Sequence, residues 1–417
     1  MYYFRYTIFS DGKANDFVVI FHNEYRRLGY TPKLLIAAKD QTNILLTFFK
    51  DGQDKSITIT TSQPEYNLNT ILITPGDGLY HAGVDIHSDK VIRLYGFLFH
   101  RYLCEGFSSI PTRYTSTHYI IPSFTVYGAA KDVYKSIFAV SSVYPRTTIN
   151  IHFKMDNGSV TYKGVQYSNN QSLTIILDKY ITFQMSHMAD LSGTLVTASK
   201  PIVIVSGNKC NIINSINYNC QPFMEMVLPV NQLDHVYIIP AIAQRLVSTV
   251  RILAVNDTQI TSENNNTKNS NMISSRNHVD LLHGNISYVT ASDDVMVVIY
   301  PHELQGKGDA FMMTVPGINQ YLYEYDFVAP VFFESYISVT VLSKSIHGFI
   351  LDNKPLNIST IYNISEESYN YSTFTLPISN GTHRISHNQH TRFGLWVYGY
   401  FTHDAYGYPG GIAFKTL

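Results

Sequence analysis

The sequence predicts an all-β protein built from tandem antiparallel β-sandwich repeats, about four units of roughly 100 residues each, with little helix. Three observations support this prediction. A stretch of about 20 residues with the same order of turns and strands occurs four times along the chain. A second strand pattern recurs with the same period. The chain also contains 32 Tyr and 23 Phe against one Trp, a composition that suits half-buried strand surfaces.

The first repeated stretch is clearest at residues 190–210, DLSGTLVTASKPIVIVSGNKC. It is expected to contain a turn at Ser192 and Gly193, a short strand at 194–197, and a second turn at 199–201. The following run at 202–205 consists of four β-branched residues, which favours a strand buried on both faces over a helix. Comparable stretches begin at Gly83, Gly284 and Gly381.

The second pattern is a strand that precedes the first in every unit. Its four copies lie at residues 16–21, 118–122, 235–240 and 325–330. A proline ends or bends the last three copies, which predicts a position at a sheet edge. The aligned aromatic residues are Phe17, Tyr119, Tyr237 and Phe327.

Further strands complete each unit. A hairpin-like pair is expected from Lys33, Thr147, Ser248 and Tyr336 onward. Another strand is expected before each glycine turn, at residues 70–74, 173–177, 278–282 and 374–376. Each unit therefore has six or seven short strands, and we place the units at residues 1–117, 118–234 (with the Cys210/Cys220 loop), 235–322 and 323–417.

Two segments have a composition that sets them apart from the predicted strands. The run SENNNTKNSNMISSRN from Ser262 is the most polar stretch, and we interpret it as a long exposed loop. The segment FTHDAYGYPGG from Phe401 is expected to be exposed, either as an aromatic binding platform or as a flexible end or linker.

The overall composition excludes several functional classes. Hydrophobic residues make up 45% and charged residues 15%, which is enough for a packed core. The formal net charge is −1 and no basic stripe is present, so nucleic-acid binding is not predicted. No stretch of about 18 apolar residues suggests a membrane span. The N-terminus lacks the pattern of a signal peptide, and we expect the chain to be a fragment that begins inside a longer protein.

The three cysteines allow one internal disulfide. Cys210 and Cys220 bracket a polar, Asn-rich loop, and closing it would stabilise the fold by about 3 kcal/mol. The alternative is two free thiols. Cys104 is then either a buried thiol or a partner for another chain.

Glycosylation sequons favour the secretory pathway. Random Ser and Thr usage would give roughly five sequons among the asparagines, whereas the chain contains nine. Occupied sequons would mark surface loops in an oxidising compartment. The sequons start at Asn157, Asn170, Asn256, Asn265, Asn285, Asn357, Asn363, Asn370 and Asn380.

No catalytic constellation emerges, and we predict no catalytic residue, metal or cofactor. The sequence contains no G-x-S-x-G, H-E-x-x-H, P-loop or Rossmann pattern. His383, His387 and His390 have a spacing that would gather three imidazoles on a helix, but the segment lies between predicted strands, so we interpret it as a solvated turn. The pair His81 and His87 is a weaker candidate.

Carboxylates offer one alternative. Asp178, Asp190 and Glu225 lie close together in the sequence, and glycosidases need two facing carboxylates. Asp190 before Leu-Ser-Gly is also an ordinary turn initiator that bonds its own backbone. We favour the turn.

The central run resembles the N-terminal domain family of IgGFc-binding protein. The matching motif residues are Asp190, Gly193, Thr194, Ser199, Lys200, Pro201, Ile202, Val205, Ser206, Gly207, Asn208 and Cys210. A second cysteine follows, and Glu225 and Pro229 match a later segment, while Met226 departs from the family's usual Gln. The resemblance extends over most of the chain, from about Asp16 to Gly411, and includes FGLWVYGY near the C-terminus.

The resemblance implies a secreted, mucus- or surface-associated module that binds proteins or glycoproteins and is not an enzyme. IgG Fc and mucin-type glycoproteins are the implied partners, and the resemblance assigns no binding residue. Two alternatives from other classes are a carbohydrate-active β-sandwich enzyme and a structural spacer of a larger mosaic protein.

Overall fold

A computed structural model describes residues 10–23, 29–100, 103–126, 134–213, 220–264, 267–304, 308–365 and 370–416. Within these ranges the chain consists of antiparallel strands, and its helical elements are 3-10 turns of three residues each. The all-β fold class with sandwich-like repeats is therefore confirmed. None of the described helices is long and apolar enough to cross a membrane.

The first set of strands is organised around one long strand. Its strands are β1 (Ala14–Val19), β2 (Thr31–Ala37), β3 (Asn43–Lys50), β4 (Gln53–Thr60), β5 (Glu65–Asn67), β7 (Val84–His100) and β8 (Leu103–Ser108). Strand β6 (Gly78–His81) lies in the same stretch of the chain but joins the sheet of the second set. The first half of β7 pairs with β1 and β3, and its second half pairs with β2 and β8. A bent strand of this kind passes from one sheet of a sandwich to the other.

The second set repeats this scheme around β16. Its strands are β9 (Ser116–Ile120), β10 (Ser136–Ser142), β11 (Thr147–His152), β12 (Ser159–Tyr162), β13 (Val165–Ser168), β14 (Ser172–Leu177), β15 (Ile181–His187), β16 (Leu195–Asn211) and β17 (Gln221–Met226). The first half of β16 pairs with β9 and β11, and its second half pairs with β10 and β17.

The third set is built around β23. Its strands are β18 (Asp234–Ile239), β19 (Ser248–Ala254), β20 (Thr258–Asn264), β21 (Thr267–Ile273), β22 (His278–His283), β23 (Ser287–Pro301) and β24 (Met313–Thr314). The pairing partners of β23 are β18, β20, β19 and β24.

In the fourth set the long strand is divided in two. Its strands are β25 (Glu324–Ala329), β26 (Glu334–Leu342), β27 (Phe349–Leu351), β28 (Lys354–Pro355), β29 (Ile361–Ser365), β30 (Asn370–Ile378), β31 (Gly381–His387), β32 (Gly394–Phe401) and β33 (Asp404–Pro409). Strand β31 pairs with β25 and β27, and β32 pairs with β26 and β33. We call the four sets units 1 to 4. The division points after residues 117, 234 and 322 stay a prediction.

The expected turn at residues 199–201 is wrong, because these residues lie inside β16. Against β9, the pairing register shifts between Thr197 and Ile202. The polar residues therefore form an irregularity that bends a continuous strand, as a β-bulge does, instead of reversing the chain. The same holds for β7 and β23, whose registers shift at the corresponding places.

The strand expected at residues 70–74 is also wrong. A 3-10 turn, η1 (Thr70–Leu72), occupies this position. The side chain of Asn69 accepts a hydrogen bond from the backbone N–H of Ile71 at 3.1 Å. This local bond competes with strand formation, as Asn side chains commonly do.

Two segments expected to lack regular structure are strands. The polar run from Ser262 forms the β20–β21 hairpin, in which Asn264 pairs with Thr267 across the turn. The segment from Phe401 continues into β33, all of whose residues are buried. The expected exposed tail is therefore a core strand of unit 4.

A buried tyrosine anchors three of the units. The hydroxyl groups of Tyr119, Tyr237 and Tyr325 each accept a backbone N–H from three residues earlier and donate to a carbonyl across the sheet. In unit 4 the anchor is Tyr325, two residues before the Phe327 that the sequence comparison aligned. Unit 1 has Phe17 and lacks the hydroxyl.

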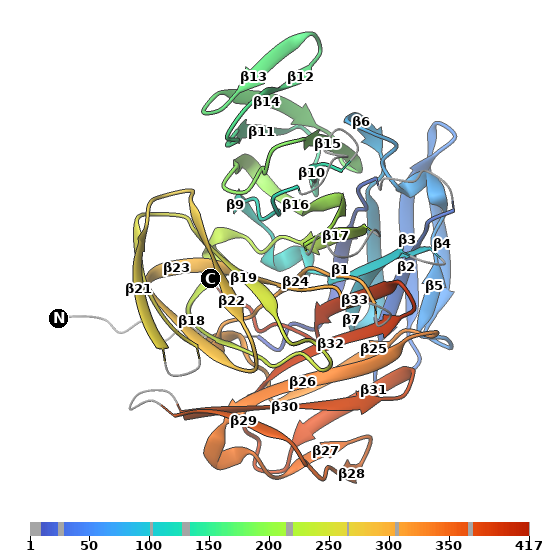
Figure 1. Ribbon diagram of the computed structural model, residues 1–417. Helices are drawn as coiled ribbons and strands as arrows, with labels where there is room; N and C mark the ends of the chain where they lie inside the picture. Colours follow the sequence, from blue (N-terminus) through green and yellow to red (C-terminus); the bar gives the residue numbers. More distant parts are fainter. Residues whose placement is uncertain are drawn as a thin grey trace, which may run out of the picture.

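The units surround a common centre instead of forming a rod (Figure 1). Their last strands meet there, with β8 packed against both β17 and β33, and β24 packed against β33. The Glu105 carboxylate in β8 accepts the backbone N–H of Met312. The amide of Gln221 in β17 donates to Asp404 in β33 at 2.9 Å. These bonds between units are reinforced by hydrophobic clusters that cross unit boundaries, one containing residues of units 1, 2 and 3 and another containing residues of units 1 and 4.

Candidate functional site

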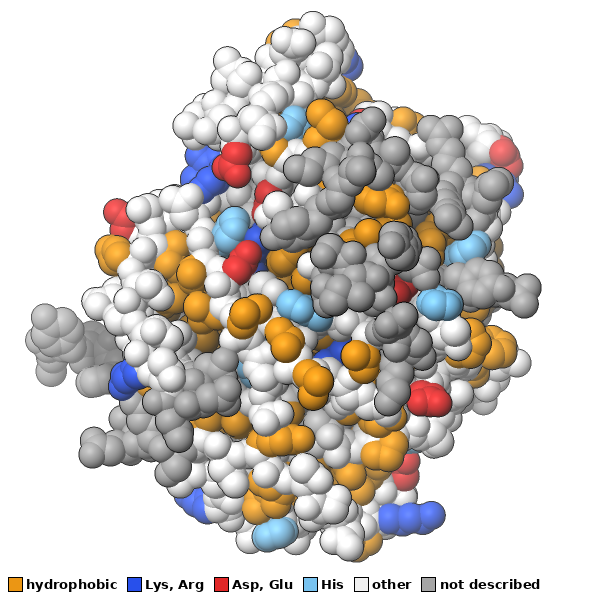
Figure 2. Space-filling view, in the orientation of Figure 1, with side chains coloured by type: hydrophobic (Ala, Val, Ile, Leu, Met, Phe, Trp, Pro, Cys, Tyr) orange, Lys and Arg blue, Asp and Glu red, His pale blue; other side chains and the backbone are white. Residues whose placement is uncertain are grey.

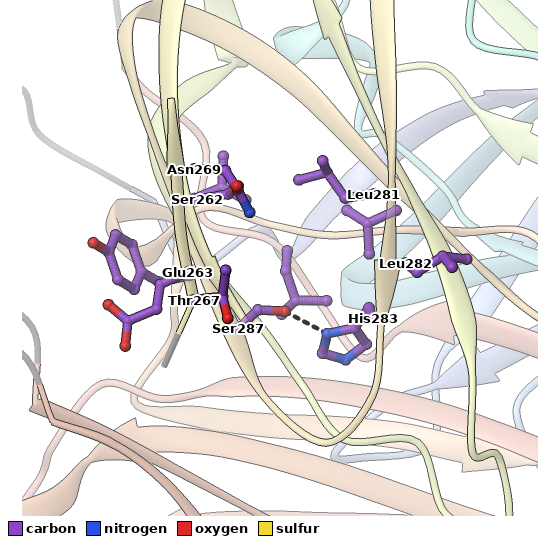
Figure 3. Close-up of a pocket in the computed structure, with 12 residues that line it drawn as sticks. Ser262, Glu263, Thr267, Asn269, Leu281, Leu282, His283 and Ser287 are labelled. Carbon is purple, nitrogen blue, oxygen red and sulfur yellow. Dashed lines mark hydrogen bonds between the residues drawn. The ribbon is translucent and has the colours of Figure 1, made fainter. Parts of the chain in front are cut away.

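A pocket opens at one end of unit 3, between the β20–β21 hairpin and strand β22 (Figure 3). Its volume is about 340 Å³, within the range of small-molecule sites. Its lining residues are Ile239, Val250, Ser262, Glu263, Thr267, Asn269, Leu281, Leu282, His283, Ser287, Tyr288 and Val289.

Polar residues of the hairpin line the pocket at positions that face the core. Ser262 pairs with Asn269 on one side and with Val289 of β23 on the other. Val289 is buried in the core of unit 3, so its cross-strand neighbours Ser262 and Asn269 share its face. Their polar side chains therefore give this face of the pocket hydrogen-bonding groups.

Units 1 and 2 have apolar side chains at the equivalent positions. In unit 1 the corresponding pair is Leu46 and Ile57, with Leu46 also opposite Ile86 of β7. In unit 2 the pair is Ile151 and Leu173. The register is the same because Phe17 lies opposite Ile86, and Tyr237 lies opposite Val289. Unit 3 therefore departs from the hydrophobic pattern of its own repeat, which is expected at functional sites.

A buried histidine forms the deep polar wall. His283 Nε2 lies 2.9 Å from the carbonyl oxygen of Pro240, and Nδ1 lies 2.5 Å from Ser287 Oγ. Burial lowers the pKa of His283 to about 4, so the imidazole is neutral at physiological pH. A carbonyl accepts only, so Nε2 carries the proton and the Ser287 hydroxyl donates to Nδ1.

Unit 1 has a cavity at the corresponding place, between the β3–β4 hairpin and β5. It measures about 490 Å³ and is lined by Phe48 and Tyr66 together with the charged side chains of Lys50 and Lys55. The repeat thus presents two open sandwich ends with different chemistry. On the face in Figure 2, acidic and basic side chains are scattered and do not gather in one patch.

The family-motif residue Asp190 holds units 2 and 3 together. Its Oδ2 lies 2.6 Å from Arg251 Nη1 of β19, and its Oδ1 accepts the backbone N–H of Ser192. Burial acts to raise the pKa of Asp190, but Arg251 and Ser192 outweigh burial, and the pKa is lowered. Asp190 is therefore an ionised group with a structural role. Its bond to the Ser192 backbone agrees with the interpretation of this stretch as a turn.

Gly193 and Thr194 belong to the same junction. Gly193 has a φ of 87°, and a Cβ there would overlap the carbonyl oxygen of Arg276. The Arg276 side chain donates to the Gly193 carbonyl at 2.9 Å. Thr194 Oγ1 accepts the backbone N–H of Lys154.

The remaining motif residues stabilise unit 2 internally. Ser199 Oγ accepts the backbone N–H of Thr148, and Lys200 Nζ donates to the carbonyl of Pro145 at 2.6 Å. Pro201 lies half-buried within β16, where the strand bends. Along this stretch, the motif residues therefore stabilise the fold of unit 2.

The last motif residues bind neighbouring segments of unit 2. Ser206 Oγ donates to the carbonyl of Ile137, and the Asn208 amide donates to the carbonyl of Phe124 at 2.9 Å. Gly207 is required because a Cβ would overlap the backbone of Phe223 in the paired strand β17.

The cysteines have definite states in the structure. Cys210 and Cys220 form a disulfide. Cys104 is a buried thiol whose Sγ lies 3.2 Å from the carbonyl oxygen of His100. It is not accessible to another chain in this fold.

The histidines considered as metal ligands have separate partners. His383 bonds Asp352 and the carbonyl of Ser379. His387 bonds two other backbone carbonyls, and His390 stacks on Tyr323 at 4.1 Å between ring centroids. His87 pairs with Asp16, and His81 stacks on Phe49.

The carboxylates considered for the enzyme alternative are engaged within the protein. Asp178 accepts the backbone N–H of Arg146. Glu225 is buried, which raises its pKa, and it accepts the backbone N–H and the hydroxyl of Thr314. Asp190 is paired with Arg251, so each of the three carboxylates has a partner within the protein.

Eight of the nine sequon asparagines lie in the described residues, and all eight are exposed. Asn265 lies outside the described residues. Asn285 is two residues before Ser287 of the pocket. Occupancy of the sequons stays a prediction.

Sequence reasoning missed the pocket residues. Ser262 and Asn269 lie in the segment interpreted as a loop, and His283 was not considered. The sequence signal for the pocket appears only when the units are compared. Leu46 and Ile151 align with Ser262 once the strand register is known.

Comparison with known proteins identifies a family that this chain matches. The IgGFc binding protein family model matches residues 105–399, more than half of the chain. The human IgGFc-binding protein is 22% identical over 402 residues, which cover 92% of this chain and 7% of the relative. The chain therefore spans a small part of that protein's length.

Solved structures show weak similarity. A 1.5-MDa bacterial ice-binding adhesin, studied for host cell surface retention, gives a TM-score of 0.12 at 10% identity, covering 72% of this chain and 93% of that chain. A Ca²⁺-stabilised adhesin with which an Antarctic bacterium binds ice gives 0.11 at 9% identity, covering 97% and 99%. At these scores we base no argument on them.

Proposed function

This chain belongs to the IgGFc binding protein family, and on that premise we propose that it is an extracellular, non-catalytic module that binds proteins or glycoproteins. The observation that carries the proposal is the open pocket of unit 3. Ser262 and Asn269 stand where units 1 and 2 have apolar pairs. The pocket thus presents polar groups where the other two units have aliphatic ones, which suits ligand binding.

The rest of the molecule suits a rigid scaffold for binding. The motif residues and the candidate carboxylates are engaged in contacts within and between units, as at Asp190 and Arg251. A rigid body with open sandwich ends in units 1 and 3 also permits multivalent contact, in which weak sites reinforce one another. We propose IgG Fc or mucin-type glycoproteins, in mucus or matrix, as partners.

Secretion is supported by the exposure of the eight described sequon asparagines and by the disulfide. The expected result in material secreted by mammalian cells is glycan on the exposed asparagines and a Cys210–Cys220 crosslink, since exposed sequons are accessible and the compartment is oxidising. Non-reducing peptide mapping by mass spectrometry, with and without glycosidase, measures both. Bare asparagines together with free Cys210 and Cys220 would contradict an extracellular role.

The binding function is tested with the same secreted chain. We expect saturable binding to immobilised IgG Fc or to an immobilised mucin glycoprotein, measured by surface plasmon resonance, with serum albumin as the control surface. Binding to Fc alone would make this an immunoglobulin-recognising module. Binding to neither surface, by a chain shown to be folded by circular dichroism, would contradict the proposal and favour the spacer alternative.

A further inference from the structure

We propose that the pocket of unit 3 binds a single neutral sugar residue of a glycan, such as a hexose or an N-acetylhexosamine. The inference rests on the binding function proposed above and specifies its ligand. It is carried by the polar groups, the apolar surface, the charge and the size of the pocket.

The hairpin side of the pocket supplies hydrogen-bonding groups. Ser262, Thr267 and Asn269 bring two hydroxyls and one amide to neighbouring positions of β20 and β21 (Figure 3). A hydroxyl donates and accepts, and an amide offers both a carbonyl oxygen and an NH₂ group. Such a set matches a ligand whose own groups are mostly hydroxyls and amides.

The opposite side combines apolar and polar residues. Ile239, Val250 and Leu281 supply aliphatic carbon to the lining. The Ser287 hydroxyl donates to His283 Nδ1 and keeps its lone pairs for accepting. Sugar rings combine an apolar C–H face with hydroxyl edges, so they satisfy both sides at once.

Glu263 is the charged residue of the described lining. It alternates with Ser262 along β20, and its carboxylate lies on the outer side of the hairpin (Figure 3). His283 is uncharged at physiological pH because of its burial. An anionic sugar or a phosphate would lose water without gaining a cationic partner, which disfavours it.

The size of the pocket is consistent with one sugar residue. A volume of about 340 Å³ is near the lower end of the range for ligand sites. A ligand of this size binds with a dissociation constant on the order of 1 mM. Useful affinity for a glycoprotein then requires several such contacts.

The repeat itself supplies the test variant. Replacing Ser262 with leucine and Asn269 with isoleucine restores the side chains that unit 1 carries at these positions. The double variant Ser262→Leu/Asn269→Ile replaces the hydroxyl and the amide of the hairpin with aliphatic side chains like those that line the unit 1 cavity. It should lose the hydrogen bonds to a ligand and be at least as stable as the wild type, so loss of binding is not explained by unfolding. Met272→Gln, on the exposed outer face of β21, is the matched control and adds no glycosylation sequon.

The experiment uses saturation-transfer difference NMR on the full secreted chain, with N-acetylglucosamine and galactose as neutral probes and N-acetylneuraminic acid as the anionic comparison. We expect at least one neutral sugar to bind saturably. Its affinity should fall at least tenfold in Ser262→Leu/Asn269→Ile and stay unchanged in Met272→Gln.

Two results would overturn this inference. One is no neutral-sugar binding at concentrations well above the expected dissociation constant. The other is neutral-sugar binding that the double variant retains. If the chain still binds Fc or mucin in either case, the proposed function stands and only the ligand assignment fails. If the wild-type chain bound neither Fc nor mucin, the proposed function itself would be rejected.

Discussion

Replacing Arg251 with methionine is expected to lower the free energy of unfolding by about 3–5 kcal/mol. The Arg251 side chain is 1% exposed and pairs with Asp190 of unit 2 and Asp280 of β22. Its guanidinium also donates to the carbonyl of Ser123 at 2.6 Å. Methionine preserves most of the aliphatic volume but leaves the buried carboxylate of Asp190 without its partner, and an unpaired buried charge is costly.

Guanidinium chloride unfolding followed by circular dichroism measures this change. The matched control is Arg384→Met, because Arg384 forms a 2.6 Å ion pair with Glu324 in which both side chains are about two-fifths exposed. A solvated pair of this kind contributes at most about 1 kcal/mol. Equal losses in the two variants would contradict the view that the motif aspartate joins units 2 and 3.

Replacing Asp309 with asparagine is expected to change the pH dependence of stability. Burial, together with Asp404 and Glu303, raises the pKa of Asp309 to about 7 against the opposing effect of Arg245. The folded state therefore binds a proton that the unfolded state has released between pH 4 and 7. Stability from this group is complete below the unfolded pKa and is lost as the pH rises through about 7.

Asparagine is neutral throughout, so the variant avoids that loss. From pH 4 to pH 8, the difference in unfolding free energy between variant and wild type should shift in the variant's favour by up to about 4 kcal/mol. Urea unfolding at a series of pH values gives this difference directly. A difference that stays constant over this pH range for Asp309→Asn would contradict the burial of a protonated carboxyl near the centre.

The sequence was sufficient for the repeat because each unit carries its own local signals. Glycine turns and apolar runs are signals between residues that are close in the sequence, so the sequence alone predicts β16 and its counterparts. The bend inside β16 was interpreted as a turn, because Ser199 and Pro201 have turn chemistry and only the pairing with β9 shows the chain continuing. Strand β33 was missed for a related reason. Its burial comes from β8, which is about 300 residues earlier in the chain.

The site was less accessible to sequence reasoning than the fold. The motif at residues 190–210 suggests function, but its side chains stabilise the strand and the junction with unit 3. The residues that make the pocket are ordinary polar residues of a hairpin. Ser262 and Asn269 become informative only when the register places them opposite Val289, where units 1 and 2 have aliphatic side chains.

The most direct test of the account is binding of the secreted chain to an immobilised mucin glycoprotein and to IgG Fc, with wild type, Ser262→Leu/Asn269→Ile and Met272→Gln compared in one series. The account predicts saturable binding to at least one surface by the wild type and by Met272→Gln, and binding reduced at least tenfold in the double variant. A folded wild-type chain that binds neither surface would contradict the proposed function. Equal binding by all three proteins would show that the pocket of unit 3 is not the contact site.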